Sequence, residues 1–155
     1  MSRLFQKARA KMISPSALGP AQPGSINVLT DTIVLLLIDT SIYAVDLNQH
    51  EFLSSVPSAA RASINGSDRS DPLTNKTAHI GSGVSYEGGI FDADDLILLA
   101  VTGNACGAVI VVKDTGNDAT SSLIDFIDQG DFPIVPTGGP IPILFSNGPN
   151  RIFRI

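Results

Sequence analysis

The chain has 155 residues, of which 43% are hydrophobic and only 16% are charged, and its formal net charge at pH 7 is −5. This length and composition fit one ordered domain with a sizeable core and exclude a disordered chain. The longest apolar run, residues 33–38, is far shorter than the ~18 residues that a membrane span needs, so we expect no membrane-spanning segment. Soluble domains usually carry about 25% charged residues. The deficit here predicts that part of the surface is covered by a partner.

The N-terminal region differs in charge from the rest of the chain. Residues 1–30 carry a net charge of +4 and no acidic residue, whereas the remainder holds all 15 acidic side chains and carries −9. Basic and apolar side chains each recur every four residues between positions 3 and 12, which predicts a short helix with a basic stripe and an apolar stripe. Such a helix is marginal alone in water, so we predict that it binds a partner. The predicted partner-binding residues are Arg3, Leu4, Phe5, Lys7, Arg9, Lys11 and Met12.

Three other interpretations of residues 1–13 stay open: a transit peptide, a helix lying on a membrane surface, and a frayed terminus. Residues 14–25 predict an extended linker, because three prolines and two glycines there can neither continue a helix nor pair as a central strand. We therefore predict an N-terminal arm, residues 1–25, and a β domain, residues 26–155. The basic arm is suited to contact the acidic surface of a neighbouring copy or of another acidic protein.

The body of the chain predicts a mostly β fold, an antiparallel β-sandwich or a barrel-like domain, because glycine- and asparagine-containing turns recur between short apolar runs. The run at residues 33–38 suits a strand buried on both faces, and residues 121–128 are compatible with a short helix or a strand, of which we favour the strand. Residues 48–54 predict a short helical turn and residues 59–73 a surface loop. We expect the last two strands to form a terminal hairpin, with Ile152 and either Ile155 or Phe153 facing the core. The predicted strands comprise residues 33–38, 42–47, 78–84, 96–101, 108–113, 121–128, 141–145 and 151–155.

The sequence contains none of the common catalytic signatures: no nucleophile elbow, phosphate-binding loop or paired-cysteine zinc motif. We therefore predict that the protein is not an enzyme and needs no cofactor. The single cysteine, Cys106, lies beside an apolar run and is expected to pack as a small buried hydrophobe. His50 and His79 are far apart in sequence, and a solvated or hydrogen-bonded histidine is favoured over a metal ligand or a base.

The acidic cluster of Asp92, Asp94 and Asp95 is the best candidate for a metal site, since Ca²⁺ takes several oxygen ligands. The cluster lacks the glycine and the closing glutamate of an EF-hand loop, so we favour a turn in which aspartates accept hydrogen bonds from nearby backbone amides. No metal is predicted. The charge of −9 on the body opposes binding of nucleic acid, and neither a nucleic-acid nor a membrane partner is predicted.

Several stretches of the chain resemble a family of small virion proteins of tailed bacteriophages. The resemblance is carried by GGIFDADDLILLAVTGNACGAVIVVKDTG within residues 88–118, SLIDFID at 122–128, the stretch at 133–139, NGPNRIFRI at 147–155, and VLLLIDTSIYAVDLNQHEFLSSVPSAARA at 34–62.

The resemblance implies a structural virion protein, made in the host cytoplasm and located on the head surface. Its expected role is that of a capsid decoration (cement) protein, whose partners are the major capsid protein and further copies of itself. We expect a homotrimer whose arm reaches adjacent capsid subunits. Two alternatives stay open: a low-copy head-to-tail connector or tail component, and a Ca²⁺-dependent carbohydrate-binding module on the virion.

Overall fold

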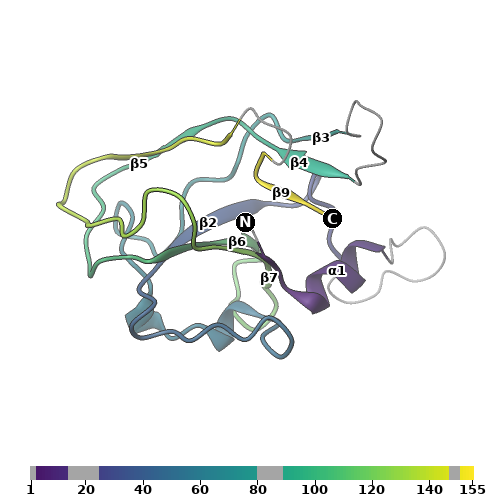
Figure 1. The fold of residues 1–155 in the computed structure, drawn as a ribbon, viewed down its shortest axis with the longest axis horizontal. Helices are drawn as coiled ribbons and strands as arrows, with labels where there is room; N and C mark the ends of the chain where they lie inside the picture. The colour runs from purple at the N-terminus through teal and green to yellow at the C-terminus, as the bar shows by residue number, and fades with distance from the viewer. Residues whose placement is uncertain (1–2, 14–24, 80–88, 147–150) are drawn as a thin grey trace.

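The computed structural model describes residues 3–13, 25–79, 89–146 and 151–155 and shows a mostly β fold (Figure 1). Antiparallel sheets pack together, and one short helix, α1 (Gln6–Ile13), lies near the N-terminus. The predicted fold class and N-terminal helix are confirmed. Within the described parts of the chain the sheets do not close into a barrel.

The central layer is a four-stranded antiparallel sheet. Its order is β1 (Arg3–Leu4), β7 (Ser122–Ile127), β6 (Ala108–Lys113) and β2 (Ile33–Ile38). β2 pairs with β6 along its whole length, and all six residues of β2 are buried. A strand buried on both faces needs apolar side chains at every position. This is why continuous apolar runs, and not alternating ones, mark the centre of the fold.

Two smaller sheets lie on one side of the central sheet (Figure 1). One has the order β3 (Thr77–His79), β4 (Ile90–Asp92) and β9 (Phe153–Arg154), and the other pairs β5 (Leu96–Leu98) with β8 (Ile141–Ile143). The predicted terminal hairpin is therefore wrong, because β8 and β9 belong to different sheets. Pairing with β4 lets the buried ring of Phe153 pack 5.0 Å from that of Phe91, centroid to centroid. Ile152 is buried as expected, and of the two alternatives Phe153 faces the core.

The predicted strand at residues 42–47 is wrong, because two aspartates turn the chain there. The Asp39 carboxylate accepts hydrogen bonds from the backbone amide and the hydroxyl of Ser41, at 2.9 and 2.6 Å. The Asp46 carboxylate accepts from the amides of Asn48 and Gln49. Such side-chain contacts compete with a β ladder. Two short 3₁₀ helices follow, η2 (Leu53–Ser55) and η3 (Ser58–Ala60), and the first overlaps the end of the helical turn predicted at 48–54.

The segment that follows η3 runs along the outer edge of β2. The amide of Ala62 donates to the Leu37 carbonyl at 3.0 Å, and the amide of Leu73 donates to the Ile33 carbonyl at 2.8 Å. Between them the Ser70 hydroxyl accepts from the Leu35 amide at 2.9 Å. The predicted surface loop at 59–73 thus closes an edge of the central sheet.

A buried arginine fastens this loop. The side chain of Arg61 is only 5% exposed, and its guanidinium lies 2.7 Å from both Asp68 and Asp118. It also donates to the carbonyl oxygens of Leu53 and Val56, at 2.9 and 2.6 Å. One side chain therefore connects η2, the loop beyond η3 and the turn that precedes β7.

Candidate functional site

The apolar residues of the predicted partner-binding helix pack on the chain's own body. Phe5 is fully buried and Ala8 is 1% exposed, and both belong to the main core. Leu4 and Met12 are partly buried against the same core. The N-terminal segment, which we define as residues 3–13, is thus docked on the β domain in this structure.

The basic residues of the N-terminal segment face acidic residues of the body. Arg3 forms an ion pair with Asp128. The Lys11 ammonium lies 2.9 Å from one carboxylate oxygen of Glu51, and that of Lys7 lies 3.5 Å from the other. The hydrogen bond from Lys11, together with the charges of both lysines, lowers the pKa of Glu51 below its usual value. The charge asymmetry seen in the sequence is used here within one molecule. Arg9 is exposed.

Backbone hydrogen bonds complete this docking site. Arg3 and Leu4 pair with Phe126 and Asp125 of β7, and the Phe5 amide donates to the Ile124 carbonyl at 3.0 Å. The amide of Gln6 donates to the Leu47 carbonyl at 2.9 Å. We call the surface formed by residues 124–128 and 47–52 the N-terminal docking site. Its backbone part was not predictable from the sequence, because strand partners far apart in the chain leave no local signal.

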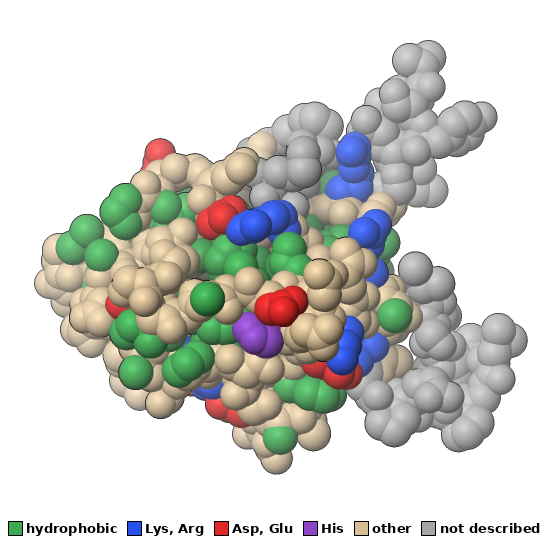
Figure 2. Space-filling view, turned by 60° about the horizontal axis from the view of Figure 1, so that its bottom comes forward, with side chains coloured by type: hydrophobic (Ala, Val, Ile, Leu, Met, Phe, Trp, Pro, Cys, Tyr) green, Lys and Arg blue, Asp and Glu red, His purple; other side chains and the backbone are tan. Residues whose placement is uncertain are grey.

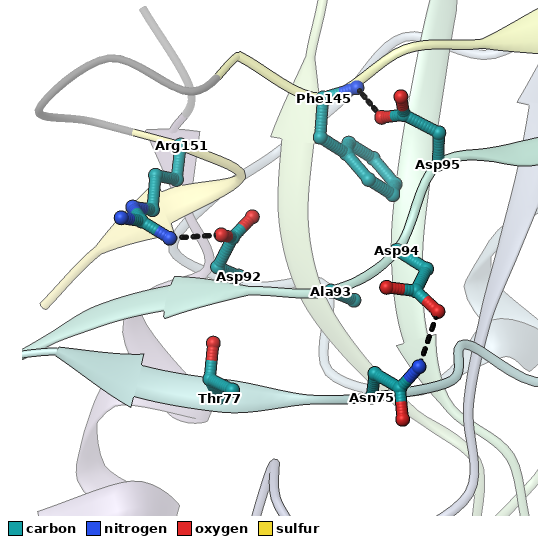
Figure 3. Close-up of a pocket in the computed structure, with 8 residues that line it drawn as sticks. All are labelled: Asn75, Thr77, Asp92, Ala93, Asp94, Asp95, Phe145 and Arg151. Carbon is teal, nitrogen blue, oxygen red and sulfur yellow. Dashed lines mark hydrogen bonds and ion pairs between the residues drawn. The ribbon is translucent and has the colours of Figure 1, made fainter.

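The three aspartates of the predicted acidic cluster line a pocket of about 430 Å³. Figure 3 shows that their carboxylates turn to different partners: Asp92 to Arg151, Asp94 to Asn75, and Asp95 to the backbone of Phe145. The Asn75 amide donates to Asp94 at 2.6 Å, and the Phe145 amide donates to Asp95 at 2.7 Å. Among the described residues no group of three or more His, Cys, Asp or Glu side chains could hold a metal ion. The arrangement ties β4 and the turn after it to the C-terminal part of the chain through Asp92 and Asp95, and to the segment before β3 through Asp94. The pocket is lined by Asn75, Thr77, Asp92, Ala93, Asp94, Asp95, Phe145 and Arg151.

The β5–β8 ribbon carries apolar side chains on both faces. Ile97 pairs with Pro142, and because side chains alternate along a strand, Leu99 and Leu144 lie on the same side as this pair. Ile97, Leu99 and Leu144 are 62%, 52% and 74% exposed. We call these four residues the outer apolar face. The inner face of the ribbon, Leu96, Leu98, Ile141 and Ile143, packs against the core.

A large groove lies alongside β8, with a volume of about 1050 Å³. Figure 2 shows hydrophobic side chains gathered at the end of the molecule that β5 occupies in Figure 1. The signal for the outer apolar face was present in the sequence, since positions 96–99 and 141–144 contain no polar residue. The groove is lined by Val109, Ile127, Gln129, Gly130, Asp131, Phe132, Ile134, Ile141, Pro142, Ile143, Leu144, Phe145, Ser146, Arg151, Ile152 and Arg154.

The contacts of Cys106 and His50 are structural. Cys106 is 1% exposed, as predicted, and burial raises the pKa of its thiol to about 11. The Nδ1 atom of His50 accepts a hydrogen bond from the Asp46 amide at 3.1 Å and lies 2.6 Å from the Tyr43 hydroxyl. The ring closes the turn that carries part of the N-terminal docking site. The side chain of His79 lies outside the described part of the structure.

No helix in the described ranges is long and apolar enough to cross a membrane. In comparisons with known proteins the chain matches no family model and no curated protein.

Proposed function

We propose that the protein is a structural assembly protein, specifically a virion decoration (cement) protein that forms a homo-oligomer on the head surface and contacts the major capsid protein. The observation that carries the proposal is the outer apolar face. A trimer and a location near capsid three-fold positions are part of the proposal.

Exposed apolar surface of this kind favours burial against another protein. Exposed contiguous apolar patches mark interaction sites. Covering such side chains contributes roughly 25 cal/mol for each Å² removed from water. The low charge content of the chain, 16%, agrees with a surface that is partly covered in the working assembly.

A second contact surface lies at the other end of the molecule. Figure 1 places α1 at the end opposite β5, and the exposed side of α1 presents Lys7 and Arg9. A protein that bridges neighbours needs two separate surfaces, and besides the outer apolar face this chain has the exposed side of α1, with Arg9 and with Lys7 beside Glu51, which we call the basic end. We propose that the outer apolar face makes the contacts between copies, and that the basic end contacts an acidic surface of the major capsid protein.

The virion assignment itself is supported by the resemblance of residues 34–62, 88–118, 122–128, 133–139 and 147–155 to small tailed-phage virion proteins. The assignment is tested by the copy number of this chain in purified virions of a phage that encodes it. Quantitative mass spectrometry measures that number relative to the major capsid protein. A copy number comparable to that of the major capsid protein supports decoration. Far fewer copies, as in a single ring, would favour a connector or tail component, and absence from the virion would overturn the assignment.

The assembly surface can be tested on the purified protein. Leu144→Asp combined with Ile97→Asp places two charges on the outer apolar face without touching the central sheet. We expect the oligomer to dissociate in light-scattering measurements of mass, while Ala44→Asp, an exposed substitution in the turn at 42–47, leaves the mass unchanged. An oligomer that survives the double substitution would place the contact elsewhere.

A further inference from the structure

We infer that Pro140 and Pro142 keep a further strand from pairing with the outer edge of β8, so that copies of the chain meet through side chains and not through a shared sheet. The outer edge is the edge of β8 that faces away from β5. Blocking of this edge follows from the ribbon itself, whereas the way in which copies meet rests on the proposed function.

The pairing of β8 with β5 determines where the backbone of Pro142 points. Residues in an antiparallel pair alternate between pairs that exchange two hydrogen bonds and pairs that exchange none. Pro142 lies opposite Ile97, and because proline has no N–H group, these two residues cannot exchange two hydrogen bonds. They therefore form a pair without hydrogen bonds, and the ring nitrogen and carbonyl group of Pro142 point to the outer edge.

Contacts at both ends of the ribbon agree with this assignment. The Leu99 carbonyl accepts a hydrogen bond from the Asn65 amide at 2.9 Å, so the backbone of Leu99, like that of Ile97, faces away from β8. The Phe145 amide donates to the side chain of Asp95, just before β5, at 2.7 Å. Amides at odd-numbered positions of this segment thus point toward β5, and backbone groups at positions 140, 142 and 144 share the outer edge.

Pro140 removes a second donor from the same edge. Pairing between the two segments continues at Val101, whose amide donates to the Gly139 carbonyl at 3.1 Å and whose carbonyl accepts from the Gly138 amide at 2.8 Å. Pro140 therefore lies within the paired stretch, and residues two apart in a strand direct their backbone groups to the same edge. Of residues 140, 142 and 144, only Leu144 has an N–H group.

An added strand needs both donors and acceptors from the edge it joins. The outer edge of β8 offers carbonyl groups at positions 140, 142 and 144 but an N–H group at position 144 alone. The carbonyl groups of an incoming strand would lose water without gaining hydrogen bonds, which is unfavourable. Proline is one of the devices by which edge strands avoid pairing with other chains.

The surrounding sequence makes this protection necessary. Residues 140–146 contain no charged side chain, and most of them are large and apolar. Short apolar segments that lack both charge and proline pair readily with copies of themselves. Within the described ranges β8 pairs only with β5, and Leu144 beside the outer edge is 74% exposed. The two prolines are therefore what separates this segment from one that adds strands.

Pro140→Val combined with Pro142→Val tests the inference, because valine restores both N–H groups and keeps the outer apolar face apolar. We expect the double variant to form fibres that bind thioflavin T and whose mass in light scattering grows with time and concentration. The unaltered protein should keep a constant mass. A double variant that keeps the mass of the unaltered protein and binds no thioflavin T would overturn the inference.

Pro140→Lys combined with Pro142→Lys is the matched control. Lysine also restores both N–H groups and removes both rings, but charges on an edge strand oppose pairing. We expect this variant to form no fibres, and amide hydrogen exchange in β2 checks that both double variants keep their fold. Fibres from the lysine variant as well would show that loss of the rings unfolds the ribbon, and the inference would fail.

The same measurements distinguish failure of this inference from failure of the proposed function. If the unaltered protein is a closed oligomer that Ile97→Asp with Leu144→Asp dissociates, but the valine variant forms no fibres, the proposed assembly surface stands and the inference is overturned. If the unaltered protein is a monomer and the valine variant forms fibres, the outer apolar face does not join copies, while the role of the prolines at the edge of β8 stands.

Discussion

The two outer edges of the central sheet are closed in different ways. The edge of β2 is covered by the continuous loop at residues 60–73, which Arg61 fastens from a position with 5% side-chain exposure. The edge of β7 is covered at 124–126 by the N-terminal segment, whose ion pairs lie near the surface.

The difference lies in how each covering segment is held: a buried arginine with several hydrogen bonds fastens one, and one buried phenylalanine with ion pairs near the surface holds the other. Removal of one partner from a buried, multiply hydrogen-bonded charge network is strongly destabilising, because the remaining groups lose that partner. Exposed ion pairs contribute little each. The predictions that follow test this contrast, from the largest expected effect to the smallest.

Arg61→Ala should give the largest loss of stability. The substitution removes donors from the carbonyl groups of Leu53 and Val56 and leaves Asp68 and Asp118 without this partner. Asp68 and Asp118 keep Arg69 as a partner, so the loss comes from the hydrogen bonds to the two carbonyl groups and amounts to about 2–4 kcal/mol, measured as the free energy of unfolding in urea.

Arg9→Ala is the matched control, since Arg9 is exposed and such surface substitutions change stability by less than about 0.5 kcal/mol. Equal effects of the two substitutions would contradict the view that the edge of β2 is fastened by Arg61.

The central strands were predictable because local sequence determines them. Residues 33–38 and 108–113 are apolar runs of strand length, and the structure places β2 and β6 at these positions. The prediction of a strand at 42–47 from hydrophobic alternation was wrong. The carboxylates of Asp39 and Asp46 accept hydrogen bonds from nearby backbone amides and turn the chain there. β4 was missed because its three residues are too short for a periodic signal.

The candidate site was predictable only in part. The spacing of basic and apolar residues predicted the helix, and both stripes do make contacts, with Ala8 in the core and Lys11 beside Glu51. That these contacts lie on the same chain could not be inferred, because a short helix shows only that it needs a surface. The surface that receives the helix is determined by tertiary contacts, which the spacing of residues along the helix does not encode.

Phe5→Ala should release the N-terminal segment while the body stays folded. Truncation of a buried phenylalanine usually lowers the free energy of unfolding by about 3–5 kcal/mol. Here the loss cannot exceed the free energy of docking, because the segment is released once that free energy is used up. We expect hydrogen exchange to lose protection at Phe5 and Gln6, whose amides are bonded to β7 and Leu47, while protection at β2 is retained. Simultaneous loss of protection in β2 would show that the segment is part of the same cooperative unit.

Acidification should loosen the N-terminal segment before it unfolds the body. The pKa of Glu51 is lowered below its usual value of 4.5 by Lys11 first and Lys7 second. A carboxylate with a depressed folded pKa stabilises the docked state above the unfolded pKa, and this contribution is lost as pH falls through the folded value. Amide chemical shifts of Ala8 should therefore stay constant from neutral pH to about pH 5 and move below it.

Glu51→Gln is the control for this titration, because the amide keeps the shape of the side chain but cannot titrate. The transition at Ala8 should shrink in the variant. An unchanged transition would exclude Glu51 as the group responsible.

Lys7→Ala and Lys11→Ala should give the smallest losses of stability. The two lysines share the carboxylate of Glu51, and comparing the variants shows how much each contributes. Lys7 is 44% exposed and 3.5 Å from Glu51, so its loss should cost no more than about 0.5 kcal/mol. Lys11 is 14% exposed, also contacts the Ser122 hydroxyl at 3.0 Å, and lies 4.2 Å from the centre of the Phe52 ring. Its loss should cost about 1 kcal/mol, read as a shift of the urea midpoint. Raising the salt concentration should widen the difference between the two losses, since the cation–π contact and the hydroxyl contact of Lys11 are partly buried and less screened than the exposed ion pair of Lys7. Equal urea midpoints for the two variants would mean that Glu51 holds the helix equally well through either lysine. The additional contacts of Lys11 would then contribute nothing to the stability of the docked helix.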